Sequence, residues 1–460
     1  MIRTLSALRR ATVAAWVLVP IYLEYLVLFV VRLAFGWSLS EARLERLHRR
    51  NADRFFRLAA RLQAGMIKAG QAISTRVDIV PSPWVERLSL LQDRVPATPW
   101  PTIEAHLRGA YGESPELRFR EIDPTPVAAA SFGQVHRAIA HDGRELALKV
   151  QYPGLRDRVE TDLFIFRIAT PLFNVFVPKV RLGAVYREVA AALRSELDYE
   201  REAEMSGRIR ENLASLPGVV VPAVVPEHGT PTVLATEFYH GQKVTDREAL
   251  VAAGIEPKAV LELVLAAWVK MVYVDGLFQS DPHPGNLLVG IRDGKPELCI
   301  LDFGQVKELP ADFHEQLFGA AAAFMTKNTR ELARSLVDLG MLDAQDAAAA
   351  GPFIEQFFQR YFHLTPAEAR SLDIQQIRRE VRELLRRIQG VTIPQDLVLH
   401  HRAVALIEGI AAALDDSQNL LVLAQPHLLR AVAQRQARTR SLAGPGSAKR
   451  TPVSPFPVAG

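Results

Sequence analysis

The first apolar segment of the chain is long and nearly unbroken. Residues 11–35 read ATVAAWVLVPIYLEYLVLFVVRLAF and follow Arg9 and Arg10. A transmembrane helix needs about 20 mainly apolar residues, so the length suffices. Pro20 and Glu24 interrupt the segment, and a carboxylate in the centre of a bilayer is costly. The pattern therefore allows two interpretations, a membrane-embedded or interfacial helix and a helix docked on the protein or a partner.

Beyond this segment, the spacing of apolar residues alternates between the patterns typical of helices and of strands. A strand-like region follows helical sequence, and its Asp142-Gly143 pair is typical of a hairpin turn. Short strand-like runs recur at VVVPAVV and TVLATEFY, and the tail AGPGSAKRTPVSPFPVAG favours disorder. The periods assign helix to residues 40–95, 155–214, 257–274 and 311–440, and strands to residues 118–151 and 219–247.

These periods predict five consecutive parts. We expect an apolar membrane-associated segment, a helical extension, a small lobe with strands, a helical lobe and a disordered tail. Their predicted bounds are residues 1–38, 39–117, 118–247, 248–440 and 441–460.

Composition and charge narrow the class of protein only slightly. The 460 residues are 49% hydrophobic and 23% charged, as in ordinary globular proteins. A net charge of +4 is small for this length and hints at an anionic partner without showing one. Cys299 is the single cysteine of the sequence, which excludes an intrachain disulfide and a cysteine metal cluster. Its setting, ELCILDF, predicts a buried strand.

Candidate chemistry gathers in two short loops and one strand. FQSDPHPGNLLV places Asp281 five positions before Asn286, and ILDFGQV supplies Asp302. Upstream, ELALKVQ carries Lys149 on a predicted strand. This is the order of parts in a protein kinase: a strand lysine for phosphates, Asn and Asp oxygens for Mg²⁺, and a carboxylate that accepts a hydroxyl proton or orients a water.

The alternative is that these residues have only structural roles. Asp281 would then cap a helix, Asn286 would form a turn, and DFG would be a turn after a core strand. Each motif is weak alone, but their joint order and close spacing, with the lysine upstream, favour the phosphate-binding interpretation.

The loop before the lysine strand departs from the usual glycine-rich form. Kinases use G-x-G-x-x-G there so that backbone N–H groups approach the phosphates. This chain has AAASFGQV over residues 128–135, with Gly133 as the only glycine. We expect a stiffer loop with altered nucleotide binding, and assign to it the cofactor-binding residues Ala128, Ala129, Ala130, Ser131 and Gly133.

Together these motifs resemble the UbiB family of atypical, protein-kinase-like proteins. The resemblance covers roughly residues 60–425. It rests on KAGQAISTRVDIVP at 68–81, LQDRVP at 91–96, VAAASFGQVH, LALKVQYPG, ELDYEREA at 196–203, DPHPGN, LDFG and HHRAVALIEGIAAALDDSQNL at 400–420.

The resemblance implies roles that the pattern alone does not. Lys149 would bind ATP with Glu202 as its helix partner, and Glu237 in TVLATEFY would contact the nucleotide. Glu196 and Asp198 would form the family's ExD site, with Asp198 on the same helix face as Glu202.

The resemblance also changes the interpretation of the KAGQ segment. Alone, Lys68 reads as a solvent-facing helix lysine. In the family it points into the site and pairs with the ExD carboxylates, and Gln71 lies near it. Such a closed site disfavours protein phosphorylation.

Two departures from the family matter. Gln279 and Ser280 stand where the family commonly has His-Ala, which puts the bracing of the loop in question more than catalysis. The bacterial ubiquinone-pathway members often carry apolar C-terminal spans, whereas here the apolar segment is N-terminal.

The sequence thus predicts an α+β, protein-kinase-like two-lobed fold with an N-terminal helical KxGQ extension and a largely helical C-lobe. We expect ATP and Mg²⁺ as cofactors, and ATP hydrolysis or phosphoryl transfer to a small or lipid-like acceptor in isoprenoid quinone or membrane lipid metabolism. The alternatives are an active protein kinase and a nucleotide-gated lipid-binding scaffold without catalysis. A small-molecule kinase of the aminoglycoside-modifying type would lack KAGQ and ELDYEREA.

The expected partners are a membrane lipid or isoprenoid quinone precursor and the membrane surface. A homodimer is possible, and no nucleic acid is expected. We place the protein on the cytoplasmic side of a bacterial inner membrane, either peripheral or held by a single N-terminal anchor.

Overall fold

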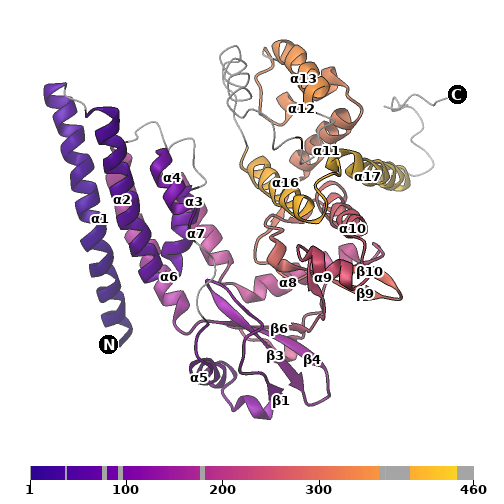
Figure 1. The fold of residues 1–460 in the computed structure, drawn as a ribbon, viewed down its shortest axis with the longest axis horizontal. Coiled ribbons are helices and arrows are strands. Elements are labelled where there is room, and N and C mark those ends of the chain that lie inside the picture. Colours follow the sequence, from indigo (N-terminus) through magenta and orange to yellow (C-terminus); the bar gives the residue numbers. More distant parts are fainter. Residues whose placement is uncertain are drawn as a thin grey trace. The chain divides into compact units, whose positions relative to one another are not determined.

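The chain folds into two compact units, each with helices and a small sheet. The computed structural model describes residues 2–36, 39–74, 80–91, 97–176, 182–345, 347–361, 368 and 394–442. Unit 1 comprises residues 1–203 and 224–238, and unit 2 comprises residues 204–223 and 239–460 (Figure 1).

Unit 1 contains an antiparallel sheet in the order β1-β3-β4-β6, with β2 paired to β3. Its strands are β1 (Phe119–Ile122), β2 (Ala128–Ala129), β3 (Gly133–Ala140), β4 (Glu145–Gln151) and β6 (Val233–Glu237). Leu146, Leu148 and Val150 alternate along β4 and are fully buried, as a half-buried strand requires. Gly143 takes φ 89° between β3 and β4, which confirms the predicted hairpin turn.

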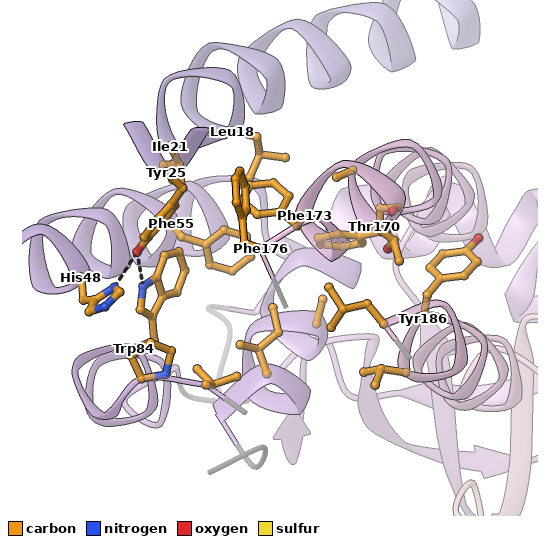
Figure 2. Close-up of a pocket in the computed structure, with 18 of the residues that line it drawn as sticks. Leu18, Ile21, Tyr25, His48, Phe55, Trp84, Thr170, Phe173, Phe176 and Tyr186 are labelled. Atoms are coloured by element: carbon orange, nitrogen blue, oxygen red, sulfur yellow. Dashed lines mark hydrogen bonds between the residues drawn. The ribbon is translucent and has the colours of Figure 1, made fainter. Parts of the chain in front are cut away.

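Helices make up the rest of unit 1. They are α1 (Ile2–Phe35), α2 (Glu41–Leu62), α3 (Gly65–Ser74), α4 (Ser82–Leu88), α5 (Trp100–Tyr111), α6 (Leu155–Asn174), α7 (Leu182–Ser195) and the start of α8 (Tyr199–Leu213). In Figure 1, α1 runs alongside α2 and α6. Ala14 and Ile21 of α1 are buried in a core shared with α2, α3 and α4. These helices also line an apolar cavity that is partly open to the surface (Figure 2).

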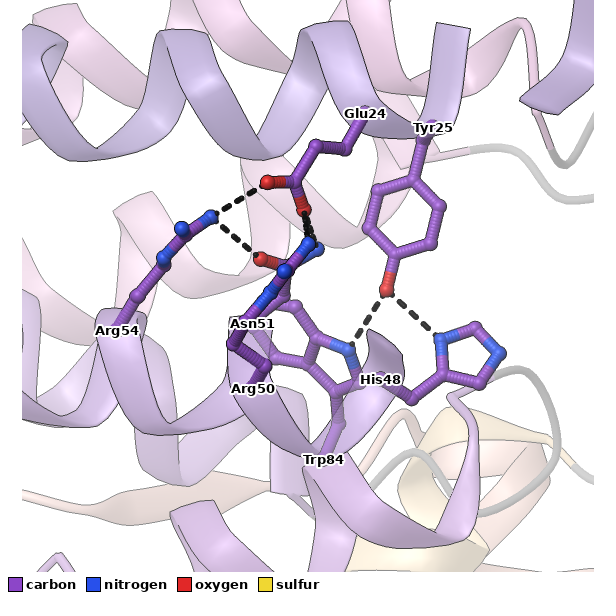
Figure 3. A network of polar contacts seen from close by, with 7 residues as sticks. All are labelled: Glu24, Tyr25, His48, Arg50, Asn51, Arg54 and Trp84. Carbon is purple, nitrogen blue, oxygen red and sulfur yellow. Dashed lines mark hydrogen bonds and ion pairs between the residues drawn. The ribbon is translucent and has the colours of Figure 1, made fainter. Parts of the chain in front are cut away.

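The carboxylate that interrupts the apolar run of α1 is paired with α2 (Figure 3). Glu24 accepts 2.8 Å contacts from Arg50 and Arg54 and a 3.0 Å hydrogen bond from Asn51. Burial raises the pKa of Glu24, but the hydrogen bonds from these three side chains outweigh burial and hold the pKa below its usual value. One face of α1 is therefore fastened to the extension by charge as well as by packing.

The opposite face of α1 is apolar and exposed. Trp16 is 83% exposed and Leu33 is 78% exposed, and Val27 lies on the same open side. Two helical stretches, residues 5–35 and 396–414, are long and apolar enough to cross a membrane by length and composition. A helix that is apolar all round is suited to burial or to contact with lipid, and α1 shows both a buried and an open side.

Unit 2 combines two small sheets with a helical region. One sheet has the order β5-β10-β9-β7, and β11 pairs with β8. The strands are β5 (Val219–Val220), β7 (Gln242–Lys243), β8 (Leu277–Gln279), β9 (Leu287–Arg292), β10 (Lys295–Ile300) and β11 (Val306–Glu308). The helices are α9 (Arg247–Ala252), α10 (Pro257–Val269), α11 (Ala311–Met325), α12 (Thr329–Asp338), α13 (Ala347–Tyr361), α16 (Gln395–Leu414) and α17 (Leu420–Leu442).

Within the described residues, the predicted helical and strand regions contain elements of the predicted kind, with one difference in extent. VVVPAVV forms only the two-residue strand β5, because Pro222 lacks the N–H that a longer ladder needs. Cys299 is buried in β10 as expected. Most of the KxGQ continuation (75–79), most of LQDRVP (92–96) and the tail beyond Leu442 lie outside the described residues, so the predicted disorder of the tail stays a prediction.

Candidate functional site

Strand β4 and helix α8 bring Lys149 and Glu202 together in unit 1. Lys149 lies mid-strand, paired in register with Val135 of β3. Its Nζ donates to Glu202 Oε1 at 2.6 Å, and the Glu202 side chain is only 3% exposed. The Tyr199 ring lies 5.3 Å from the same ammonium. A buried carboxylate thus fixes the position of a cation that keeps part of its surface open, as phosphate binding requires.

The Ala-rich loop is a tight hairpin beside this pair. Ala128 and Ala129 form β2, and the Ala130 N–H donates to the Gly133 carbonyl at 2.9 Å. No residue from 128 to 133, all of them described, has positive φ, so alanine fits without strain. A Cβ on Gly133 would lie 2.4 Å from the Val150 carbonyl oxygen, so this position needs glycine for the close approach of two strands. Ser131, at the tip, is buried.

The KAGQ helix α3 places its lysine against the predicted ExD segment. Lys68 Nζ lies 3.4 Å from Glu196 Oε2, and both side chains are less than 20% exposed. The Phe132 ring of the Ala-rich loop lies 6.0 Å from the same ammonium. Gln71 donates to the Leu91 carbonyl at 3.0 Å. Lys68 is therefore a half-buried, paired lysine, as the resemblance implies, whereas its helix position alone predicts a solvent-facing one.

Asp198 differs from the geometry expected of it, whereas the predicted nucleotide contact of Glu237 stays a prediction. Asp198 precedes α8 and caps it, with Oδ1 accepting from the Arg201 N–H at 3.0 Å, so it does not share a helix face with Glu202. The carboxylate suits this position because it accepts a hydrogen bond from an N–H at the helix start that has no partner within the helix. Glu237 is the last residue of β6, paired in register with Leu146, and its side chain is exposed.

The β9–β10 hairpin brings the two predicted metal ligands together in unit 2. Leu287 pairs with Ile300, and the Leu301 N–H donates to the Asn286 carbonyl at 2.9 Å. Asn286 and Asp302 therefore lie at the same open end of the hairpin. An amide oxygen and a carboxylate are the hard donors that Mg²⁺ takes, usually keeping several waters. Within the described residues, no cluster of three or more His, Cys, Asp or Glu is placed to hold a metal, and the fit to Mg²⁺ rests on these two oxygen donors.

A buried glutamine fastens the Asp281 loop to the DFG segment. Gln279 ends β8, is 2% exposed, and donates from Nε2 to the Asp302 carbonyl. The next residue repeats the link, since the Ser280 N–H donates to the Gln305 carbonyl at 2.9 Å. The departure from His-Ala therefore leaves the loop braced by side-chain and backbone hydrogen bonds.

The structure adds a residue that the sequence did not indicate. Arg402 of α16 lies with Nη2 3.2 Å from Asp281 Oδ2. The guanidinium is half exposed and the carboxylate is 23% exposed. Such a contact holds the carboxylate in one orientation. The helical pattern of HHRAVAL gave no signal for it, because any helix arginine reads as solvent-facing.

Comparison with known proteins identifies the family. A model of the ABC1 atypical kinase-like domain matches residues 90–336, more than half of the chain. The chain belongs to the ABC1 atypical kinase-like family. This assignment confirms the resemblance to UbiB proteins, because the relatives include a probable protein kinase UbiB of Xylella fastidiosa, 29% identical over 82% of this chain and 69% of that one.

Other relatives of this ABC1 protein occur in photosynthetic organisms. An uncharacterized Synechocystis protein is 33% identical over 82% of this chain and 67% of its own length. The chloroplastic protein ACTIVITY OF BC1 COMPLEX KINASE 8 of Arabidopsis thaliana is 31% identical over 82% of this chain, which spans about half of that relative (53%). The family name and these relatives place the chain in the kinase-like class.

A solved structure supports the same fold. Rv3197 of Mycobacterium tuberculosis, solved in complex with erythromycin, matches with a TM-score of 0.53 and 25% identity over 84% of this chain and 98% of that one. The predicted α+β kinase-like fold with a helical extension and a helical C-lobe is thereby confirmed.

Proposed function

We propose that this ABC1 protein binds ATP with Mg²⁺ and either hydrolyses it or transfers its phosphoryl group to a small or lipid-like acceptor. The observation that carries the proposal is the Lys149–Glu202 ion pair at 2.6 Å, with the glutamate almost fully buried. A buried carboxylate that holds a partly open lysine on a central strand is what phosphate binding in kinases uses.

Each candidate residue has a distinct part in this proposal. Lys149 neutralises phosphate oxygens, and backbone N–H groups of residues 128–133 cover them. Asn286 and Asp302 would hold Mg²⁺, which supplies charge neutralisation at the transferred phosphoryl group. Asp281, oriented by Arg402, would accept the proton of the attacking hydroxyl or water as its oxygen bonds to phosphorus and the bond to the ADP oxygen breaks.

The proposed acceptor or effector is a membrane lipid or an isoprenoid quinone precursor. Two facts favour this class: a relative is named a probable protein kinase UbiB, and α1 presents an exposed apolar face. We place the protein at the cytoplasmic side of the inner membrane. Glu24 holds one side of α1 on α2, so the exposed apolar side of α1 can lie on the membrane surface while the helix stays attached to the protein.

The test is ATP hydrolysis by the purified full chain, with and without anionic-lipid liposomes and a phenolic quinone-precursor analogue. We expect Mg²⁺-dependent phosphate release that liposomes increase and that EDTA abolishes, since the metal neutralises the developing charge. Excess Mg²⁺ added back after EDTA should restore the rate. Turnover that is unchanged by EDTA would contradict the Mg²⁺ part of the proposal.

Other outcomes would favour the alternatives. Label transferred from ATP to a protein would support an active protein kinase, for which Lys68 has to leave Glu196. ATP binding without turnover under every condition would favour a nucleotide-gated scaffold.

Arg402 offers a test of the Asp281 role. Arg402→Gln should lower kcat for ATP by about fivefold and leave the KM for ATP unchanged, because a half-exposed ion pair contributes up to about 1 kcal/mol. Arg402→Lys should recover much of the loss, since the positive charge returns. Arg334→Gln, an exposed arginine of α12 in the same unit, is the matched control and should behave as wild type. A raised KM with normal kcat would assign Arg402 to binding instead.

A further inference from the structure

The helices of unit 1 line a partly open cavity, and none of the predicted kinase residues is among the described residues of its wall. Its volume is about 560 Å³, within the usual range for small-molecule sites of roughly 300–1,000 Å³. Walls come from α1, α2, α3, α4, α6 and α7 (Figure 2).

The cavity wall is almost entirely carbon. Figure 2 shows Phe55 of α2, Phe173 at the end of α6 and Phe176 just beyond α6 turned toward the space. Phe173 and Phe176 pack with ring centroids 6.1 Å apart in an edge arrangement. Leu18 and Ile21 complete the wall on the α1 side. Such a surface binds hydrocarbon. It offers a polar molecule no hydrogen bonds to replace those that the molecule made with water.

The few polar groups in the wall mostly bond to one another. Tyr25 Oη lies 2.8 Å from His48 Nδ1 and accepts from Trp84 Nε1 at 3.1 Å (Figures 2 and 3). The Thr170 hydroxyl donates to the Phe166 carbonyl of its own helix. Burial lowers the pKa of His48, which favours the neutral ring. These groups leave little hydrogen bonding for a sugar, a nucleotide or a peptide.

Among the residues that the structure describes, Arg32 is the cation in the cavity wall. Arg32 lies in the last turn of α1, and its side chain is exposed to solvent while it contributes to the cavity wall. A guanidinium at the open edge of a carbon-lined space suits an anionic or polar head whose tail lies inside. The cavity therefore has an apolar interior and a charged edge, which match the apolar tail and the polar head of a lipid.

Helix α1 also gives such a ligand a route. Its inner side lines the cavity through Leu18, Ile21 and Tyr25, whereas Leu23 and Val27 are at least half exposed on the outer side. Both sides of one helix are thus apolar, and the outer one suits the surface of a bilayer. A molecule leaving the bilayer would therefore pass along apolar side chains of α1 on its way to the cavity.

We propose that this cavity binds the hydrocarbon chain of one lipid, with its polar head at Arg32. The same chemistry would come from an acyl or a prenyl chain. The proposal commits to a single lipid as the occupant, rather than to a second protein chain, because the space is a cavity of small-molecule volume with a charged edge.

The site also has a connection to the candidate kinase residues, and this part rests on the proposed function. Ala69 and Ile73 of α3 line the cavity, and the same helix carries Lys68. Val185 and Val189 of α7 line it too, and α7 ends directly before Glu196, the partner of Lys68. A lipid in the cavity therefore sets the spacing of α3 and α7 and acts on the Lys68–Glu196 contact.

Binding is tested with a fluorescent fatty acid, dansyl-undecanoic acid, on the full detergent-free chain. We expect saturable binding of one probe per chain, competed by palmitate and by geranylgeraniol; whichever competes better identifies the chain type. Ala169→Phe fills the cavity from α6 and should weaken probe binding at least about tenfold. Ala192→Phe, at an exposed position of α7, is the matched control and should bind as wild type.

A second variant keeps the test decisive if Ala169→Phe does not fold. Arg32→Gln changes an exposed side chain, and it should weaken palmitate severalfold while leaving geranylgeraniol unchanged. Equal probe binding by wild type and folded Ala169→Phe, or equal palmitate affinity after Arg32→Gln, would overturn the proposal. A wild-type dimer that binds no probe and that Ala169→Phe dissociates would assign the cavity to a second copy.

The two proposals fail separately. Probe binding that Ala169→Phe weakens, without ATP turnover under any condition, would leave the lipid site standing and remove the proposed function. Mg²⁺-dependent turnover without probe binding would do the reverse. Palmitate or geranylgeraniol that binds and leaves turnover unchanged would overturn only the connection through α3 and α7.

Discussion

Asp302→Asn should lower Mg²⁺-dependent ATP turnover by at least about a hundredfold, since changes to mere partners of metal ligands already cost 10–100-fold. The substitution keeps the shape of the side chain. Asp302 Oδ1 accepts from the Gly304 N–H at 2.9 Å, and an amide oxygen accepts the same bond. What is lost is one negative charge at the open end of the β9–β10 hairpin. The fold should therefore persist while the affinity for Mg²⁺ falls.

The same hairpin provides a matched control. Asp293 lies in the turn at its other end, exposed, with φ 51°, a conformation that asparagine adopts readily. Asp293→Asn makes the identical chemical change and should leave turnover as in wild type. Steady-state phosphate release over a range of Mg²⁺ concentrations measures both variants. Excess Mg²⁺ should partly rescue Asp302→Asn, and an undiminished rate at low Mg²⁺ would show that Asp302 is not a metal ligand.

The parts of the site that sequence predicts well are those that local structure brings together. Asn286 and Asp302 are close because two adjacent strands pair between them, and the apolar runs around both motifs announce that hairpin. The position of Lys149 on a strand could likewise be predicted, from the strand-like sequence around it. Its partner Glu202 came only from the family resemblance, because the 53-residue separation leaves no periodic signal.

Contacts between elements far apart in the sequence could not be predicted from the pattern. Arg402 of α16 contacts Asp281 on the loop after β8, and an arginine in a helix carries no sign of its partner. For Asp198 the sequence predicted a relation that is absent: it was expected to share a helix face with Glu202, but it caps the start of the helix. Helix ends are uncertain by a residue or two, and that is enough to change the direction of a side chain.

The apolar N-terminal run is the clearest case of ambiguity. Hydropathy alone cannot separate a helix that spans lipid from one that forms the wall of a cavity, because both need carbon on most sides. The carboxylate of Glu24 favoured docking over a position in lipid, and its contacts with Arg50 and Arg54 show that α1 is docked on α2. The exposed outer side explains why the composition nevertheless resembles a membrane segment.

Arg10→Met should destabilise unit 1 by about 3–5 kcal/mol, the usual loss when one partner of a buried ion pair is removed. Arg10 Nε and Nη2 contact Asp162 at 2.5 and 2.7 Å, and the Asp162 side chain has no exposed surface. Arg10 also donates to the carbonyls of Leu62 and Gln63 at the end of α2. One guanidinium thereby joins α1, α2 and α6. Thermal unfolding followed by calorimetry measures the loss.

Arg9→Met is the matched control, because Arg9 is the exposed neighbour on the same helix. It should unfold as wild type does. Equal stability of the Arg9 and Arg10 variants would mean that the buried pair does not hold α1 in place. α1 would then be free to act as a separate anchor.

The pH dependence identifies the mechanism of that loss. Burial raises the pKa of Asp162 above 3.8, and contacts from Arg10 oppose the rise. Because the folded state disfavours the ionised carboxylate, ionisation costs stability as the pH rises from 3.8 through the folded pKa. Without Arg10 that cost grows, so the gap between Arg10→Met and wild type should widen with rising pH and narrow on acidification. Adding Asp162→Asn to Arg10→Met removes the charge and should recover part of the stability at neutral pH. A gap that is independent of pH would instead assign the loss to packing of the arginine side chain.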